Sequence, residues 1–167
     1  MFPQKRRSRG DLGTEDCDII LQNFPMPIPE IVIDTNVIVA GLRSRRGSAS
    51  RLLTMVGIGL FNINLSVPVV LEYEDVLLRE AINLPITQTE VQDLLDFYCS
   101  VAKVHEIFFL WRPFLNDPKD DMILELAVKS DCDRIITYNI RDFAGVEQFG
   151  LQVVQPASFL QSIGVLP

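Results

Sequence analysis

From residue 30 onward, two patterns of apolar positions alternate along the chain. Short continuous or alternating apolar runs predict β-strands, and apolar residues spaced by three and four predict amphipathic helices. The predicted strands cover 30–34, 60–65, 103–110, 134–137 and 151–155, and the predicted helices cover 48–57, 66–82, 87–102, 117–131 and 156–163. This alternation predicts an α/β fold, a three-layer α/β/α sandwich around a mostly parallel sheet of about five strands.

Residues 1–29 have a different character from the rest of the chain. Four basic and four acidic residues cancel there, and prolines stand at positions 25, 27 and 29. Such a segment cannot bury enough apolar surface to fold by itself. We therefore expect a disordered or loosely docked extension over 1–29 and one domain over 30–163.

The charge balance limits how the protein could bind nucleic acid. The chain has 167 residues, with 15 Lys and Arg against 22 Asp and Glu, and a net charge of −7. Its overall field does not attract a polyanion, so nucleic acid binding needs a local basic patch or bound cations. No apolar run reaches the roughly 18 residues that span a bilayer. We expect a cytoplasmic protein with no membrane contact.

Cysteine and histidine offer little for metal binding or nucleophilic catalysis. Cys17, Cys99 and Cys132 are odd in number and far apart, which fits neither a disulfide framework nor a zinc site. We expect them to be small buried hydrophobic residues. His105 is the one histidine in the sequence, which excludes a repeated histidine metal site.

Four acidic residues are predicted to lie near the carboxyl ends of the strands, where parallel sheets bind their ligands. Asp34 ends the first strand, Glu74 lies on the second helix, Asp120 begins the fourth helix, and Asp142 follows the fourth strand. Each has an ordinary alternative role as a helix cap, a rim residue or a turn former. If the carboxyl ends of the strands bring them together, their repulsion calls for a hard divalent cation. Oxygen ligands favour Mg²⁺ or Mn²⁺.

Two local patterns support particular members of this set. Glu74 is predicted to lie within an apolar helical stripe formed by Val67, Val70, Leu71, Leu77, Leu78 and Ala81. A carboxylate facing a core is costly unless it is paired or binds a cation. Asp120 shares a side with Ile123 and Leu124, and it also fits a capping box that begins at Asp117.

Three segments carry a resemblance to a known family. "VIDTNVIVAGL", "LSVPVVLEYEDVL" and "DPKDDMILELAVKSDCDRIITYNIRDF" occur in the order found in the PIN-domain family of metal-dependent ribonucleases, and most resemble the toxin-type members of toxin–antitoxin pairs. The resemblance covers residues 30–163. It implies that Asp34, Glu74, Asp120 and Asp142 are the catalytic, metal-binding acids.

The resemblance also separates close candidates. Asp120 is preferred to Asp121 because it stands seven residues before Ala127, as in the family pattern. Some relatives read T-G-D where this chain has Thr137, Tyr138 and Asn139, so the fourth acid is Asp142. By the same resemblance, the residues that orient the acids are Thr35, Asn36, Thr137 and Asn139.

The activity implied by the resemblance is hydrolysis of RNA phosphodiester bonds with Mg²⁺ or Mn²⁺. The implied partners are an RNA substrate, a cognate antitoxin protein and a second copy of the chain in a homodimer. We expect the RNA to be contacted by a basic cluster in the segment "GLRSRRGSASR", formed by Arg43, Arg45, Arg46 and Arg51. Gly41 and Gly47 indicate a mobile loop there. The alternative for this cluster is a solvated loop.

The residues alone are also compatible with other functions. One is an RNA-binding or RNA-processing module without a toxin role, or a non-catalytic scaffold. Another is a receiver-like or dehalogenase-like enzyme built on Asp34. A dehalogenase-like site requires a second Asp at position 36, where this chain has Asn36. Both kinds of site also require a lysine near the C-terminal end of the domain, and no lysine follows Lys129.

Overall fold

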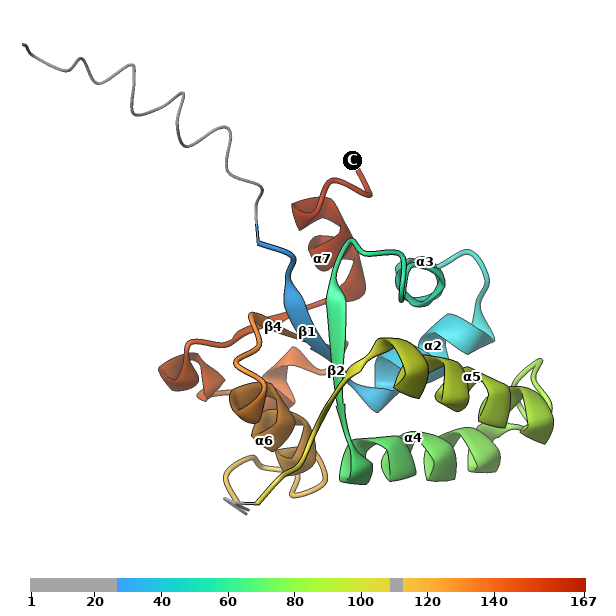
Figure 1. The fold of residues 1–167 in the computed structure, drawn as a ribbon, viewed down its shortest axis with the longest axis horizontal. Helices are drawn as coiled ribbons and strands as arrows, with labels where there is room; N and C mark the ends of the chain where they lie inside the picture. The colour runs from blue at the N-terminus through green and yellow to red at the C-terminus, as the bar shows by residue number, and fades with distance from the viewer. Residues whose placement is uncertain (1–26, 109–112) are drawn as a thin grey trace, which may run out of the picture.

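Five parallel strands form the central sheet of the protein (Figure 1). The computed structural model describes residues 27–108 and 113–167. The strands lie in the order β3-β2-β1-β4-β5, and every neighbouring pair is parallel. Their bounds are Glu30–Ile33 (β1), Asn62–Ser66 (β2), Lys103–His105 (β3), Arg134–Ile136 (β4) and Gln152–Val154 (β5). The predicted parallel sheet is confirmed, with β1 at its centre.

Six α-helices and two 3₁₀-helices connect the strands in the described part of the chain. The α-helices are Thr35–Arg43 (α2), Ser48–Thr54 (α3), Val67–Glu80 (α4), Gln88–Val101 (α5), Asp121–Lys129 (α6) and Pro156–Ser162 (α7), and the 3₁₀-helices are Ile140–Phe143 (η1) and Val146–Phe149 (η2). Helix α5 begins at the predicted capping box, since Thr87 and Glu90 exchange side-chain and backbone hydrogen bonds.

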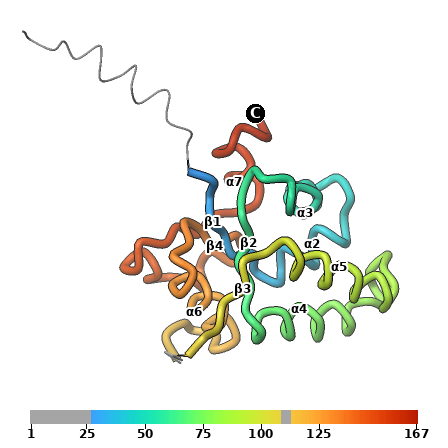
Figure 2. Tube along the Cα trace, in the orientation of Figure 1, coloured from blue at the N-terminus to red at the C-terminus, as the bar shows by residue number. Residues whose placement is uncertain are grey.

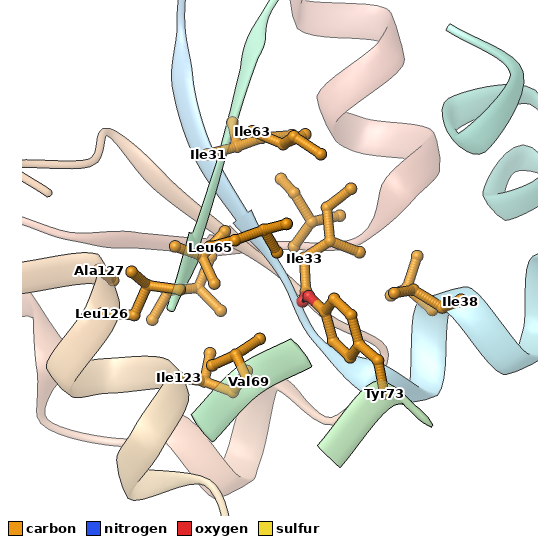
Figure 3. Close-up of a cluster of buried hydrophobic side chains, with 14 of the residues drawn as sticks. Ile31, Ile33, Ile38, Ile63, Leu65, Val69, Tyr73, Ile123, Leu126 and Ala127 are labelled. Carbon is orange, nitrogen blue, oxygen red and sulfur yellow. Dashed lines mark hydrogen bonds between the residues drawn. The ribbon is translucent and has the colours of Figure 1, made fainter. Parts of the chain in front are cut away.

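The helices form one layer on each face of the sheet, which confirms the predicted three-layer sandwich. Helix α6 packs against β1, β2 and β4 on one face, while α2 contacts α3 and α4 on the other. Figure 2 shows α5 lying beside α4 and β3 beside β2 at the edge of the sheet. In Figure 3, Ile38 and Tyr73 lie on one side of the central strands, and Leu126 and Ala127 of α6 lie on the other.

The topology explains where a site can form. The chain runs from β1 outward through β2 to β3, and then returns past β1 to β4 and β5. Ligands of such sheets bind beyond the carboxyl ends of the strands, at the point where this direction reverses. Here that point lies between Asp34, which follows β1, and Thr137, which follows β4. The Asp34 amide donates to the Ile136 carbonyl at 2.9 Å, which fixes the two loops side by side.

Helix α2 is a difference from the sequence-based prediction. It covers Gly41 and Arg43, which were assigned to a mobile loop. Gly41 is a close-packing position, because a Cβ there would lie 2.5 Å from Leu53 Cδ1 and 3.1 Å from the carbonyl carbon of Ala49. The glycine lets α2 and α3 approach each other, and it gives no evidence of mobility.

Three smaller predictions were wrong. Asp117 does not cap a helix, because α6 begins at Asp121, and the Asp117 Oδ1 accepts from the Lys119 amide in the preceding turn. Cys132 is buried as expected, but Cys99 is exposed. The third predicted strand ends at His105, and its residues 109–110 lie outside the described part.

Predictions for residues 1–26, including that for Cys17, also fall outside the described part. Among the helices of the described residues, none combines the length and the apolar character required to cross a membrane.

Candidate acidic site

Asp34 lies at the carboxyl end of β1 with its carboxylate held in place on one side. Only 6% of the residue is exposed. Its Oδ2 accepts from Thr137 Oγ1 and from Asn36 Nδ2, each at 2.6 Å. Asn36 Nδ2 also donates to Thr137 Oγ1 at 3.0 Å, and the Asn139 amide donates to the same hydroxyl at 2.9 Å. The orienting role predicted for Asn36 and Thr137 has the contacts it requires.

The pKa of the Asp34 carboxyl lies above its ordinary value. Burial raises it most, and the nearby carboxylate of Asp142 raises it further, while hydrogen bonds from Thr137 and from the Asn36 and Thr35 backbone oppose the rise. The contribution of Thr35 therefore comes through its backbone. A carboxylate with this environment would gain stability from a nearby cation.

A hollow of about 400 Å³ opens beside Asp34 between α2, α4 and the start of α6. Its acidic residues outnumber its basic ones by five to two. The acids are Asp34, Glu72, Glu80, Asp117 and Asp120, and the bases are Arg43 and Lys119. One of those bases is already engaged, because Arg43 pairs with Glu80 at 3.1 Å. The remaining excess of negative charge makes this the acidic site of the protein.

The apolar stripe predicted on α4 was wrong at its outer positions, because Val67 and Leu71 are 64% and 57% exposed. The buried row consists of Val69, Tyr73 and Leu77. Tyr73 reaches the sheet, where its hydroxyl donates to the Ile33 carbonyl (Figure 3).

Glu72 and Glu80 are the glutamates of α4 that line the acidic hollow, with Val76 between them at the same helical spacing, and Glu80 is paired with Arg43. Glu74 does not line the hollow. Residues two apart on a helix point in nearly opposite directions, so both cannot face one site. The sequence signal that was missed is the i, i+4, i+8 row of Val69, Tyr73 and Leu77, which places Glu72 beside the inner face.

Asp120 and Asp121 have separate roles in the structure. Asp121 is 2% exposed, and its Oδ1 accepts from the Leu115 amide at 2.9 Å and the Phe114 amide at 3.3 Å. It holds the preceding loop. Asp120 lines the hollow and makes no side-chain cap to α6. The preference for Asp120 therefore agrees with the geometry.

The pKa of Asp120 is raised to about 7. Burial is the largest cause, and the carboxylates of Asp34, Asp117, Asp142 and Asp121 follow in that order. The charge of Asp142 is thus close enough to raise the pKa of both Asp34 and Asp120. Asp142 lines an adjoining hollow with Asn139. Asn139 lines both hollows.

The predicted arginine cluster is divided in two. Arg43, in the last turn of α2, lines the acidic hollow. A separate hollow of about 460 Å³ beside α3 contains Arg45, Arg46 and Arg51, together with Ser48, Ser50 and Thr54. The four arginines therefore do not form one loop surface.

The donor set of the acidic hollow fits a hard divalent cation, because it offers carboxylate and amide oxygens. Within residues 27–108 and 113–167, however, no three His, Cys, Asp or Glu side chains form a group that could hold a metal ion. The acids are close enough to shift one another's pKa, but they do not form a complete set of metal ligands. Binding an ion would require the side chains of Glu72 and Asp120 to move toward the fixed carboxylate of Asp34.

The chain resembles known proteins in its sequence and in its fold. A family model described as a PIN domain matches residues 30–141, up to the residue before Asp142. A similar solved structure is a chain of VapBC2 from Rickettsia felis, crystallised bound to a DNA fragment from their promoter. It is 15% identical, with a TM-score of 0.52, and the match covers 74% of this chain and 98% of that chain. No curated protein matched the chain.

Proposed function

Because the chain belongs to the PIN-domain family, whose members are in general nucleases, we propose that it is a Mg²⁺- or Mn²⁺-dependent endoribonuclease. The observation that carries the proposal is the hollow lined by Asp34, Glu72 and Asp120 at the reversal point of the sheet. The mutual repulsion of these carboxylates destabilises the fold when no cation is bound. A reaction at a phosphodiester with a bound cation accounts for their position.

The ion would be held by Asp34, Asp120 and Asp142, with Glu72 in the role that the family resemblance implies for Glu74. When bound, a divalent cation lowers the pKa of a water molecule and offsets negative charge on a phosphate. Asp34 contributes a carboxylate whose orientation is fixed by Thr137 and Asn36. Fixed ligands avoid the cost of ordering a side chain during the reaction.

The arginines supply the attraction for RNA that the net charge lacks. Arg43 lines the acidic hollow and pairs with Glu80, which would hold its charge near a phosphate bound there. Arg45, Arg46 and Arg51 would contact phosphates farther along the RNA. Replacing Arg45 and Arg46 by Glu should raise KM and reduce the salt dependence of KM. Kinetics that are unchanged across salt concentrations would contradict this role.

The structural neighbour supports a more specific role. We propose that the protein is the toxin of a toxin–antitoxin pair, since the similar chain comes from a VapBC2 complex. A cognate antitoxin would mask the acidic hollow with a basic side chain, and a homodimer is proposed as the assembly. A short reading frame upstream of this one, encoding a DNA-binding segment, would favour the toxin role over RNA processing.

The test of the activity is RNA cleavage in Mn²⁺ and in EDTA. Cleavage should require the metal and should be lost in Asp34→Asn. Glu72→Gln and Glu74→Gln form a matched pair on one helix, because each removes one charge without changing size. We expect a loss of about a hundredfold or more in kcat/KM for Glu72→Gln and little change for Glu74→Gln. Cleavage in EDTA, or an active Asp34→Asn, would overturn the proposal.

If purified protein binds RNA but does not cleave it in Mn²⁺, a binding or scaffolding module becomes the better description. If it cleaves RNA but its expression does not slow growth, an RNA-processing role without toxicity is favoured. These outcomes separate the alternatives that the sequence leaves open.

A further inference from the structure

A second hollow continues the acidic site along the carboxyl edge of the sheet. It measures about 470 Å³ and is lined by Tyr138, Asn139, Ile140, Arg141, Asp142 and Gln155. These residues follow β4 and β5, which are neighbouring parallel strands. Since Asn139 lines both hollows, the two form one continuous surface.

The position of Tyr138 is tied to the acidic site by hydrogen bonds. Its amide donates to Asn36 Oδ1 at 3.2 Å, and the same Asn36 side chain donates to Asp34. The preceding residue, Thr137, donates its amide to the Val154 carbonyl at 3.0 Å. The backbone that carries the Tyr138 ring is therefore fixed relative to the acidic carboxylate.

Tyr138 is a partly open aromatic residue on the surface of this hollow. The residue is 37% exposed, and the neighbouring Ile140 is 43% exposed. Among the described residues, neither the ring nor the hydroxyl of Tyr138 has an aromatic or hydrogen-bonding partner. An aromatic ring left open to water beside a charged site is a typical stacking surface.

We propose that this hollow binds a nucleobase of single-stranded RNA, next to the phosphodiester that is cleaved, with the base stacked on Tyr138. The inference rests on the proposed ribonuclease function. The side-chain amides of Asn139 and Gln155 offer donors and acceptors to a base edge, and Arg141 offers a charge to a phosphate. A base can reach an aromatic ring in this way only when it is unstacked, so single-stranded RNA is the substrate.

A nucleobase fits this surface better than a protein side chain. The hollow combines an open ring with two amides and a guanidinium, and these are the groups with which proteins hold unpaired bases. The hollow shares Asn139 with the acidic hollow, and Asp142 is one of its own lining residues. A base next to a phosphate held by the acids would therefore lie close to Tyr138.

The test combines Tyr138 variants with RNA that lacks single bases. An RNA with a mapped cleavage site is prepared with an abasic residue at each position around that site. Tyr138→Ala should raise KM about ten- to a hundredfold with little change in kcat, since stacking contributes to substrate binding. Tyr138→Phe should behave like the wild type. Phe97→Ala, which removes an exposed ring on α5, is the control.

The abasic substitution at one position should raise KM for the wild type and should have no further effect on Tyr138→Ala. Additive effects at every position, or an unchanged KM for Tyr138→Ala, would overturn the base-binding role and leave the ring to a protein partner. A wild-type protein that cleaves no RNA in Mn²⁺ would refute the proposed function itself. Thermal melting of each variant checks that the fold is retained.

Discussion

Asp120→Asn should stabilise the metal-free protein while it removes activity. The Asp120 carboxyl has a pKa of about 7, against an ordinary value of 3.8. Its charged form is therefore less stable in the folded chain than in the unfolded chain. Asn has nearly the same size and no charge. Since the Asp120 side chain caps no helix amide, the substitution loses no hydrogen bond at the start of α6.

The magnitude follows from that pKa. A rise from 3.8 to about 7 corresponds to about 4 kcal/mol at 1.36 kcal/mol per pH unit. Asp120 is only half-buried, so contact with water reduces both the cost of burial and the repulsion from the other carboxylates, to a total of about 1–2 kcal/mol. For a domain of this size, the gain is about 2–8 °C in Tm.

The sign can be checked with pH. Above about pH 7, folded Asp120 must carry its charge, so the full gain from Asn is expected there. As pH falls toward about 4, folded Asp120 is neutral and the unfolded residue also takes up a proton, so the gain disappears. The measurement is urea or thermal unfolding in EDTA at several pH values.

Asp121→Asn is the control for Asp120→Asn. It weakens the hydrogen bonds that a buried carboxylate accepts from the Leu115 and Phe114 amides, and it should destabilise the fold by about 1–3 kcal/mol. Addition of Mn²⁺ should stabilise the wild type more than Asp120→Asn, because the ion binds the folded state. An Asp120→Asn protein that is less stable than wild type at pH 8, or a gain independent of pH, would refute the reasoning.

Three further predictions concern stability. Gly41→Ala should lower the free energy of unfolding by about 1–3 kcal/mol, since its Cβ would meet Leu53. Gly47→Ser is the control: its Cβ would have only Ser44 Oγ at 4.0 Å, and Ser is a favoured residue at this N-cap of α3, so stability should change by a few tenths of a kcal/mol; equal losses in chemical denaturation would contradict the close packing. Thr87→Ala should remove about 1 kcal/mol with the capping box of α5, measured in the same way, and a neutral result would show that the cap adds nothing. Burial raises the pKa of Glu30, but hydrogen bonds from Lys103, Asn62 and Asn64 outweigh it, so the pKa is lowered. The stability that Glu30 contributes is therefore present above its unfolded pKa and is lost as pH falls through its folded pKa. Glu30→Gln should reduce the loss of stability at acidic pH, and an unchanged loss would exclude this role.

The sequence was sufficient for the sheet and for Asp34. The apolar run of β1 lies between polar residues, so it predicts a buried strand, and Asp34 follows it at the edge where ligands bind. Capping chemistry placed the start of α5 correctly, because Thr87 and Glu90 interact within a single turn. These predictions depend on residues that are close in sequence.

The face of α4 could not be predicted in the same way. Helical spacing shows which residues share a side, but it does not show which side meets the sheet. Apolar residues occur on both sides of α4, and the exposed Val67 and Leu71 made the outer side resemble the inner one. Tyr73 decided the orientation, since its ring packs inward and its hydroxyl reaches the Ile33 carbonyl.

From the sequence alone, the alternation of strands and helices is predictable except for α2, as are the parallel sheet and the position of Asp34 directly after β1. Only the tertiary structure decided that Glu72 and not Glu74 faces the acids, that Asp121 holds a loop while Asp120 lines the hollow, and that Arg43 is separated from the other arginines. The physical reason is that periodicity is a property of one segment. The direction in which a side chain points depends on the segments packed around it, and these are distant in sequence.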